Sequence, residues 1–167
     1  MHRINEVVFC SALALLPALQ VHAQAPAPVL QDEANLLLLE VRLGRHVLAD
    51  AVTAYQVERE IFLPLGELSK LLTLAIRTTP GEGRARGYIL SEDRVFNLDV
   101  IEREVIIGGR RETLDRAQVK LQHEDIYVSS RALARWLPVD IEVDLPSLAV
   151  EVRPREKLPM QAGLERR

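Results

Sequence analysis

The chain has 167 residues, 48% of them hydrophobic and 27% charged, and its formal net charge is −3. This balance disfavours a general nucleic-acid binder, because such proteins carry a clustered positive charge that contacts phosphates. The length suits one ordinary domain or two small units that share a core.

Features of a secretory signal peptide occupy residues 1–23. Arg3 gives a short basic start, residues 7–19 form an apolar run, and Val21-His22-Ala23 has the small-x-small spacing of a cleavage site. The run is too short for a good membrane-spanning helix, so an uncleaved anchor is the weaker alternative. We therefore expect a periplasmic or secreted protein whose mature chain has a net charge of −3, no cysteine and no transmembrane segment. Residues 24–35 are predicted to be a proline-containing linker.

Apolar alternation and turn residues then predict a series of short elements. In chain order these are a strand at 36–43, a turn at 44–45, an extended run at 47–52, a buried strand at 61–63, a short helix after Pro64, a strand at 74–76, a loop at 80–87 and a strand at 88–90. Pro64 suits the first turn of a helix.

A second series has the same order of elements. It comprises a strand at 96–100, a strand at 104–107 ending in the Gly108-Gly109 turn, a buried strand at 126–128, a short helix capped by Ser130, a strand at 139–141, a turn at 146–147 and a strand at 148–152. Trp136 belongs to the apolar face of the helix, so we expect it in the core.

The two series match at a fixed shift of 65 residues, with Gly44 on Gly109, Ile61 on Ile126 and Leu68 on Leu133 in the sequence. We therefore predict an α+β fold of two tandem strand-rich units, 36–92 and 93–153, each with one short helix. Neither unit is large enough to bury both sides of its strands, so they are expected to share a core. The basic tail, 154–167, is predicted to be poorly ordered.

Residue types that bind metals are sparse. His46 and His123 would need carboxylates such as Glu124 and Asp125 to complete a metal site, and neither histidine has a ligand at suitable spacing nearby. We interpret both as solvated loop histidines and expect no cofactor and no metal.

Catalytic patterns are equally weak. Ser129 and Ser130 precede a helix but lack the glycines that a strained nucleophile turn requires, which favours a helix cap. The acidic pair Glu58 and Glu60, like the pair at 124–125, is interpreted as solvated loop charge. No catalytic residue is therefore assigned.

A glycine-rich segment at 81–87 is reminiscent of a phosphate-binding loop. It lacks the lysine-serine/threonine ending and leads into a strand rather than a helix, so it is interpreted as a flexible hairpin loop. Arg84 and Arg86 within it are candidate contacts for an acidic partner.

The repeated pattern resembles the copper amine oxidase N-terminal-like domain, or stalk domain, of bacterial envelope proteins. The matching residues are Leu43-Gly44-Arg45 and Phe62-Leu63-Pro64-Leu65-Gly66-Glu67-Leu68 with Leu71-Leu72, and in the second copy Ile107-Gly108-Gly109-Arg110 and Tyr127-Val128-Ser129-Ser130-Arg131-Ala132-Leu133 with Trp136-Leu137. Ser129 replaces the family's proline, and Pro138 replaces a usual glycine. The resemblance implies a non-catalytic module, because the copper site of amine oxidases lies in a different domain.

The layout of signal, linker and module also resembles the periplasmic N-terminal region of outer-membrane usher-like proteins, which export pilus subunits through a β-barrel. The chain stops at Arg167, before a barrel would begin. Three alternatives stay open: a truncated gene, a separate periplasmic protein, or an unrelated user of the module.

These observations predict an exported, non-catalytic binding or assembly module of the cell envelope. The expected partner is an envelope protein or pilus-type subunit that adds a strand to an exposed sheet edge. The alternatives are a peptidoglycan-associated module and, less favoured, a hydrolase that uses Ser129 or Ser130, or a metal-dependent one that uses His46 and His123.

Overall fold

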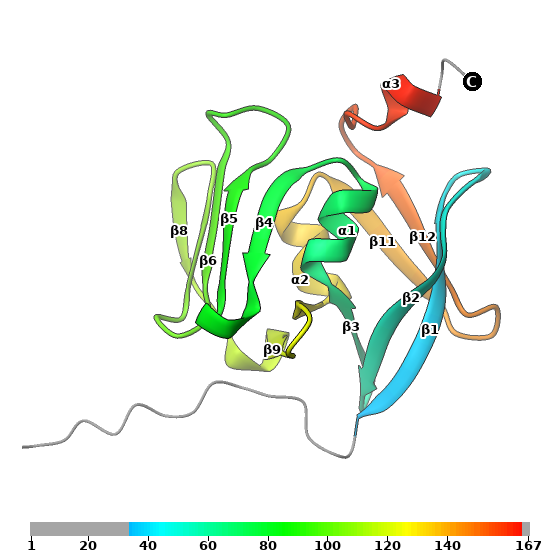
Figure 1. Cartoon of the computed structure of the whole chain (residues 1–167), viewed down its shortest axis with the longest axis horizontal. Coiled ribbons are helices and arrows are strands. Elements are labelled where there is room, and N and C mark those ends of the chain that lie inside the picture. Colours follow the sequence, from blue (N-terminus) through cyan, green and yellow to red (C-terminus); the bar gives the residue numbers. More distant parts are fainter. Residues whose placement is uncertain (1–33, 165–167) are drawn as a thin grey trace, which may run out of the picture.

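A computed structural model describes residues 34–164. The predicted signal peptide, the linker up to residue 33 and the last three residues of the tail lie outside the described residues. Within 34–164, the chain forms two β-sheets and a few short helices (Figure 1). The strand-rich α+β character that the sequence predicts is therefore present.

The larger sheet has seven strands in the order β11-β12-β1-β2-β3-β10-β9. Their bounds are β1 Asn35–Leu43, β2 His46–Val57, β3 Glu60–Pro64, β9 Val119–Leu121, β10 Ile126–Ser129, β11 Val139–Asp144 and β12 Ala149–Pro154. All neighbours are antiparallel except β1 and β12, which pair in parallel through Val41 and Val150.

The smaller sheet has five antiparallel strands in the order β4-β5-β6-β7-β8. Their bounds are β4 Ala75–Thr79, β5 Arg84–Tyr88, β6 Val95–Asp99, β7 Glu104–Ile107 and β8 Arg110–Thr113. Strand β4 forms one edge of this sheet and β8 forms the other.

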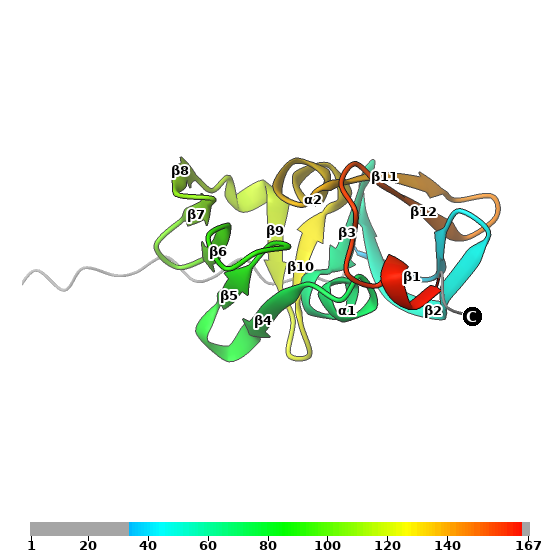
Figure 2. The same cartoon turned by 90° about the horizontal axis from the view of Figure 1, so that it is seen from above.

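The helices are short. They are α1 Leu65–Leu71, α2 Ser130–Trp136, α3 Gln161–Leu164, and the 3-10 turns η1 Pro80–Glu82 and η2 Arg116–Gln118. Figure 2 shows α1 and α2 on opposite sides of the neighbouring strands β3 and β10. Each of these two helices packs against the strand that follows it in the chain, α1 on β4 and α2 on β11.

Strands β3 and β10 pair in an antiparallel register whose central pair joins residues 65 positions apart. Leu63 lies opposite Val128, and the flanking pairs are Phe62 with Ser129 and Pro64 with Tyr127. Strand β12, late in the chain, pairs with β1 at its beginning. Early and late segments are therefore neighbours at two places in the larger sheet, β12–β1 and β3–β10.

One hydrophobic cluster takes buried side chains from both sheets and from α1 and α2. Its members include Leu39, Leu63, Leu68, Leu98, Leu133, Trp136 and Val150. The ring of Trp136 lies 6.3 Å from that of Phe96 of the smaller sheet, so the predicted core position of this tryptophan is confirmed.

The segment from 80 to 90 differs from its prediction. Residues 84–87, predicted to be a loop, form most of β5, and this strand ends at Tyr88. Leu90, predicted to be in a strand, has a φ of +63° that turns the chain away. The flexible-loop interpretation is wrong because β5 is held on both sides by β4 and β6.

The C-terminal segment packs against the core up to α3, although the sequence predicts a poorly ordered tail from residue 154. The Arg155 guanidinium donates to four oxygens, those of Ala134, Leu137 and Val139 in the backbone and one of the Asp140 carboxylate. Leu158 is buried in the core. Across residues 34–164, no helix has the length and apolar character needed to cross a membrane.

Candidate binding surface

The two histidines belong to separate parts of the fold. His46 begins β2, and His123 lies in the turn before β10. In the part of the chain that the structure describes, no group of three or more histidine, cysteine or acidic side chains could hold a metal ion. The structure therefore does not assemble a metal site around either histidine.

Ser129, not Ser130, caps α2. The Ala132 backbone N–H donates to the Ser129 hydroxyl at 3.2 Å, while Ser130 is the first residue of the helix. The prediction of a serine cap is confirmed, and its assignment to Ser130 is wrong by one position. The Ser129 hydroxyl is buried and serves the helix end.

Asp125 is buried, which contradicts its interpretation as solvated loop charge. Its carboxylate accepts backbone N–H groups from Gly66 and Glu67 at 2.9 Å and from Ile126 at 2.7 Å. The bonds from Gly66 and Glu67 satisfy two N–H groups in the first turn of α1, where Pro64 offers no side-chain cap. Asp125 is therefore a helix cap supplied from a distant segment.

Gly66 is the residue that allows this contact. A Cβ at position 66 would lie 2.9 Å from both carboxylate oxygens of Asp125 and 2.5 Å from the Thr78 hydroxyl. A glycine in the first turn of a helix is the only sequence signal that marked this site.

Glu60, in the other acidic pair, forms an ion pair with Arg131 at 2.9 Å, while Glu58 lies exposed in the turn before β3.

Burial also affects two neighbouring ionisable groups. Partial burial and the Asp125 carboxylate raise the pKa of Glu67 above its usual value, and Lys70 opposes this. Burial, helped by Tyr55 and Glu124, raises the pKa of the Tyr127 hydroxyl well above its usual value. Tyr127 packs edge-on against Tyr55, with ring centroids 4.8 Å apart, so its role here is packing.

Arg84 and Arg86 lie on β5 with different surroundings. The Arg84 guanidinium donates to the Asp99 carboxylate at 2.8 Å. Partial burial disfavours the charged form of Asp99, but the Glu102 N–H and Arg84 outweigh this and hold the pKa of Asp99 below its usual value. Arg84 is thus held in an ion pair with Asp99, whereas Arg86 is exposed and has no such partner among residues 34–164.

Arg86 lies directly opposite Arg77 of β4 in the antiparallel register. Both are exposed, and neither forms an ion pair with any residue of 34–164. Like charges directly opposite each other destabilise a sheet, so this pair lowers stability unless an anion lies nearby. Sequence reasoning missed Arg77, because its pairing with Arg86 depends on the register of β4 and β5.

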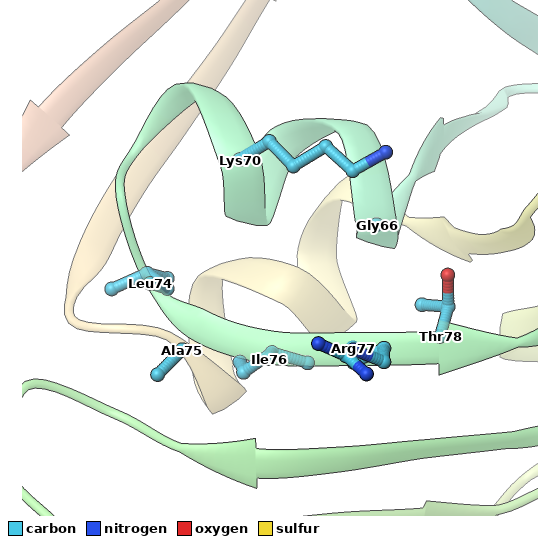
Figure 3. A pocket seen from close by; sticks show the side chains of 7 residues that line it. All are labelled: Gly66, Lys70, Leu74, Ala75, Ile76, Arg77 and Thr78. Atoms are coloured by element: carbon cyan, nitrogen blue, oxygen red, sulfur yellow. The ribbon is translucent and has the colours of Figure 1, made fainter.

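A groove of about 550 Å³ runs between α1 and β4 (Figure 3). Its lining residues are Gly66, Lys70, Leu74, Ala75, Ile76, Arg77 and Thr78. Figure 3 shows Lys70 on the helix side and Arg77 on the strand side. The groove therefore combines the edge of a sheet with two cationic side chains.

The terminal strands of the two sheets differ in how open they are to a partner. β9 has only three residues, and β8 has four, all exposed and mostly charged. β11 has six, but Arg153 pairs with Glu142 on it, and Arg155 fills the space between β11 and the end of α2. Short and charged edges resist strand pairing. β4, with five residues beside an open groove, is the most receptive of these edges.

Comparison with known proteins finds no matching family model, no matching curated protein and no matching solved structure. The resemblance to the stalk domain therefore stays a prediction that rests on the residues quoted for it.

Proposed function

We propose that this protein is an exported, non-catalytic binding module of the bacterial cell envelope, and that it binds a protein partner by strand addition at β4. The observation that carries the proposal is the unpaired edge of β4 beside the groove under α1. An added strand pairs through main-chain hydrogen bonds, while neighbouring pockets read its side chains.

A non-catalytic role is supported by the contacts of the residues that sequence reasoning considered reactive. Ser129 caps α2, and Asp125 caps α1. A nucleophile or general base needs a free polar atom directed at a substrate. These groups instead bind backbone N–H groups of the fold.

The proposal treats residues 36–92 and 93–153 as two tandem units with a shared core. It is supported by the β3–β10 pair, whose central residues Leu63 and Val128 are 65 positions apart. The similar packing of α1 on β4 and α2 on β11 also supports it. In this view, β4 and β11 are equivalent edges, and the second is occupied by the chain's own Arg155.

The resemblance to stalk domains and to the periplasmic region of usher-like proteins gives the proposal its biological setting. We place the module in the periplasm, as part of a machinery that assembles surface fibres. The partner is then an envelope protein or a pilus-type subunit with an extended segment.

Site-specific photo-crosslinking in intact envelopes tests the proposal. A photoreactive residue at Thr79, exposed on β4, is expected to give a crosslinked protein adduct of defined mass. The matched control is the same residue at Thr113, exposed on β8 at the opposite edge of the same sheet. Equal adducts at both positions, or none at Thr79, would contradict strand addition at β4.

A further inference from the structure

The partner's chemistry can be inferred from the side chains around the open edge, on the premise of the proposed function. Lys70 and Arg77 line the groove, and Arg86 lies opposite Arg77 on the same face of the sheet. None of the three forms an ion pair with another residue of 34–164. Arg77 and Arg86 thus have no counter-charge among these residues, whereas Lys70 interacts with the nearby Glu67 carboxylate.

The two faces of β4 require different side chains from a strand that pairs with it. Ala75, Arg77 and Thr79 are exposed, while Ile76 between them is buried and Leu74 contributes apolar lining to the groove. Side chains alternate between the faces of a strand, and directly opposite residues lie about 5 Å apart. A partner strand therefore places every second residue beside the arginines and the others toward the apolar lining.

We propose that β4 and the groove beside it select an extended segment of another envelope protein in which acidic and apolar residues alternate. Its carboxylates lie on the face of Arg77 and Arg86, and its apolar residues face Leu74 and Ile76. Carboxylate–arginine pairs there offset the repulsion between the two arginines.

Strand β11, which corresponds to β4 at the shift of 65 residues, shows why the partner's choice between the two edges depends on charge. In β11, the residue 65 positions after Arg77 is Glu142, and it is flanked by Asp140 and Asp144. Arg153 and Arg155 pair with Glu142 and Asp140, but β11 itself has no basic residue that could attract an acidic segment. Because charge complementarity acts mainly on specificity and association rate, the difference directs the partner to one end of the molecule.

Fluorescence anisotropy with labelled peptides tests the inference on the full chain. The probe is an eight-residue peptide of alternating glutamate and valine, and the matched peptide has lysine in place of glutamate. We expect the acidic peptide to bind at least about tenfold more tightly, and more weakly as salt is added. Hydrogen exchange should show new protection of the β4 amides when it is bound.

Charge reversal locates the interaction. Arg77→Glu, and Arg86→Glu in a separate variant, should each weaken binding of the acidic peptide by about tenfold. Arg77→Gln removes the charge without reversing it, so it should reduce the affinity for the acidic peptide by less. It also serves as a milder variant in case Arg77→Glu fails to fold. The matched control, Arg110→Glu on the exposed opposite edge β8, should change the affinity by less than about twofold.

The outcomes separate this inference from the proposed function. Suppose that both peptides bind equally, that the charge reversals have no effect, and that β4 is still protected from exchange. Strand addition at β4 then stands, and the selection of acidic segments is wrong. If neither peptide protects β4, both are wrong. If the protein instead self-associates in sedimentation and Glu142→Arg abolishes this, the occupant is a second copy, and the inference of another protein is overturned.

Discussion

A single buried carboxylate connects two distant segments of this protein. Asp125 lies 59 positions from Gly66 in the chain, yet it accepts the backbone N–H groups at the start of α1. Pro64, which precedes that helix, has no side-chain oxygen to serve as a cap. The beginning of α1 is therefore stabilised by tertiary structure rather than by its own sequence.

Replacement of Asp125 should destabilise the fold. Asp125→Ala leaves three backbone N–H groups without their acceptor, two of them at a helix start, and we expect a loss of about 2 kcal/mol. The measurement is the free energy of unfolding in urea. Asp115→Ala, which removes an exposed cap of η2, is the control and should cost about 1 kcal/mol or less. Equal losses would show that Asp125 has no special role.

Glu67 should make stability depend on pH. Burial raises its pKa above the usual 4.5, so the folded state binds the proton more tightly than the unfolded state does. The resulting stability is present at low pH and is lost as the pH rises through the raised pKa.

Glu67→Gln should accordingly stabilise the protein at pH 7, by less than about 1 kcal/mol because the group is partly exposed, and should have no such benefit at low pH. The measurement is the free energy of unfolding in urea of the variant and the parent, from low pH to pH 7. Glu92→Gln, at an exposed position, is the control. A benefit that grows toward low pH would contradict the assigned sign.

At the scale of elements, the close pairing of β4 and β5 sets the position of the open edge. Gly87 of β5 has a φ of +154°, and a Cβ there would lie 1.8 Å from the Ala75 carbonyl oxygen of β4. No rotamer change can relieve a contact with backbone. Any side chain at position 87 must therefore push the two strands apart.

Gly87→Ala should cost about 3 kcal/mol or more and displace β4 from the sheet. Gly81→Ala, a position with no atom within 4 Å of its added Cβ, should change stability by no more than about 0.5 kcal/mol. Urea unfolding measures both, and hydrogen exchange of the β4 amides reports the strand pairing. Normal protection of β4 in Gly87→Ala would contradict the steric argument.

At the scale of the whole molecule, the two halves of the chain are interleaved. β12 from the second half pairs with β1 from the first, and β4–β5 joins β7–β8 in one sheet through β6. The core cluster draws on both halves. The two halves therefore bury their strands in one common core.

Fragments 34–92 and 93–164, divided in the exposed loop at Glu92, should each be unfolded alone and should fold when mixed. Circular dichroism of the separate and mixed fragments checks this, with the intact chain as reference. A fragment that unfolds cooperatively by itself would contradict the shared core.

Much of the local structure was predictable from the sequence. The turns at Gly44 and Gly108, the buried strands around Leu63 and Val128, and the two short helices all appear as expected. These features depend on residue spacing and turn chemistry, which act over a few positions. The prediction for residues 84–87 was wrong because their glycine and arginines indicate a loop, whereas pairing with β4 and β6 makes them a strand.

The sequence by itself determined the order and type of most elements and the repeat at 65 residues, because alternation and turn residues act locally. Only the tertiary structure decided that Asp125 is buried against Gly66 and that Arg77 faces Arg86. The contact between Asp125 and Gly66 joins segments 59 positions apart in the chain. The pairing of Arg77 with Arg86 depends on strand register, because a slip of one residue would move every side chain of the strand to the other face of the sheet.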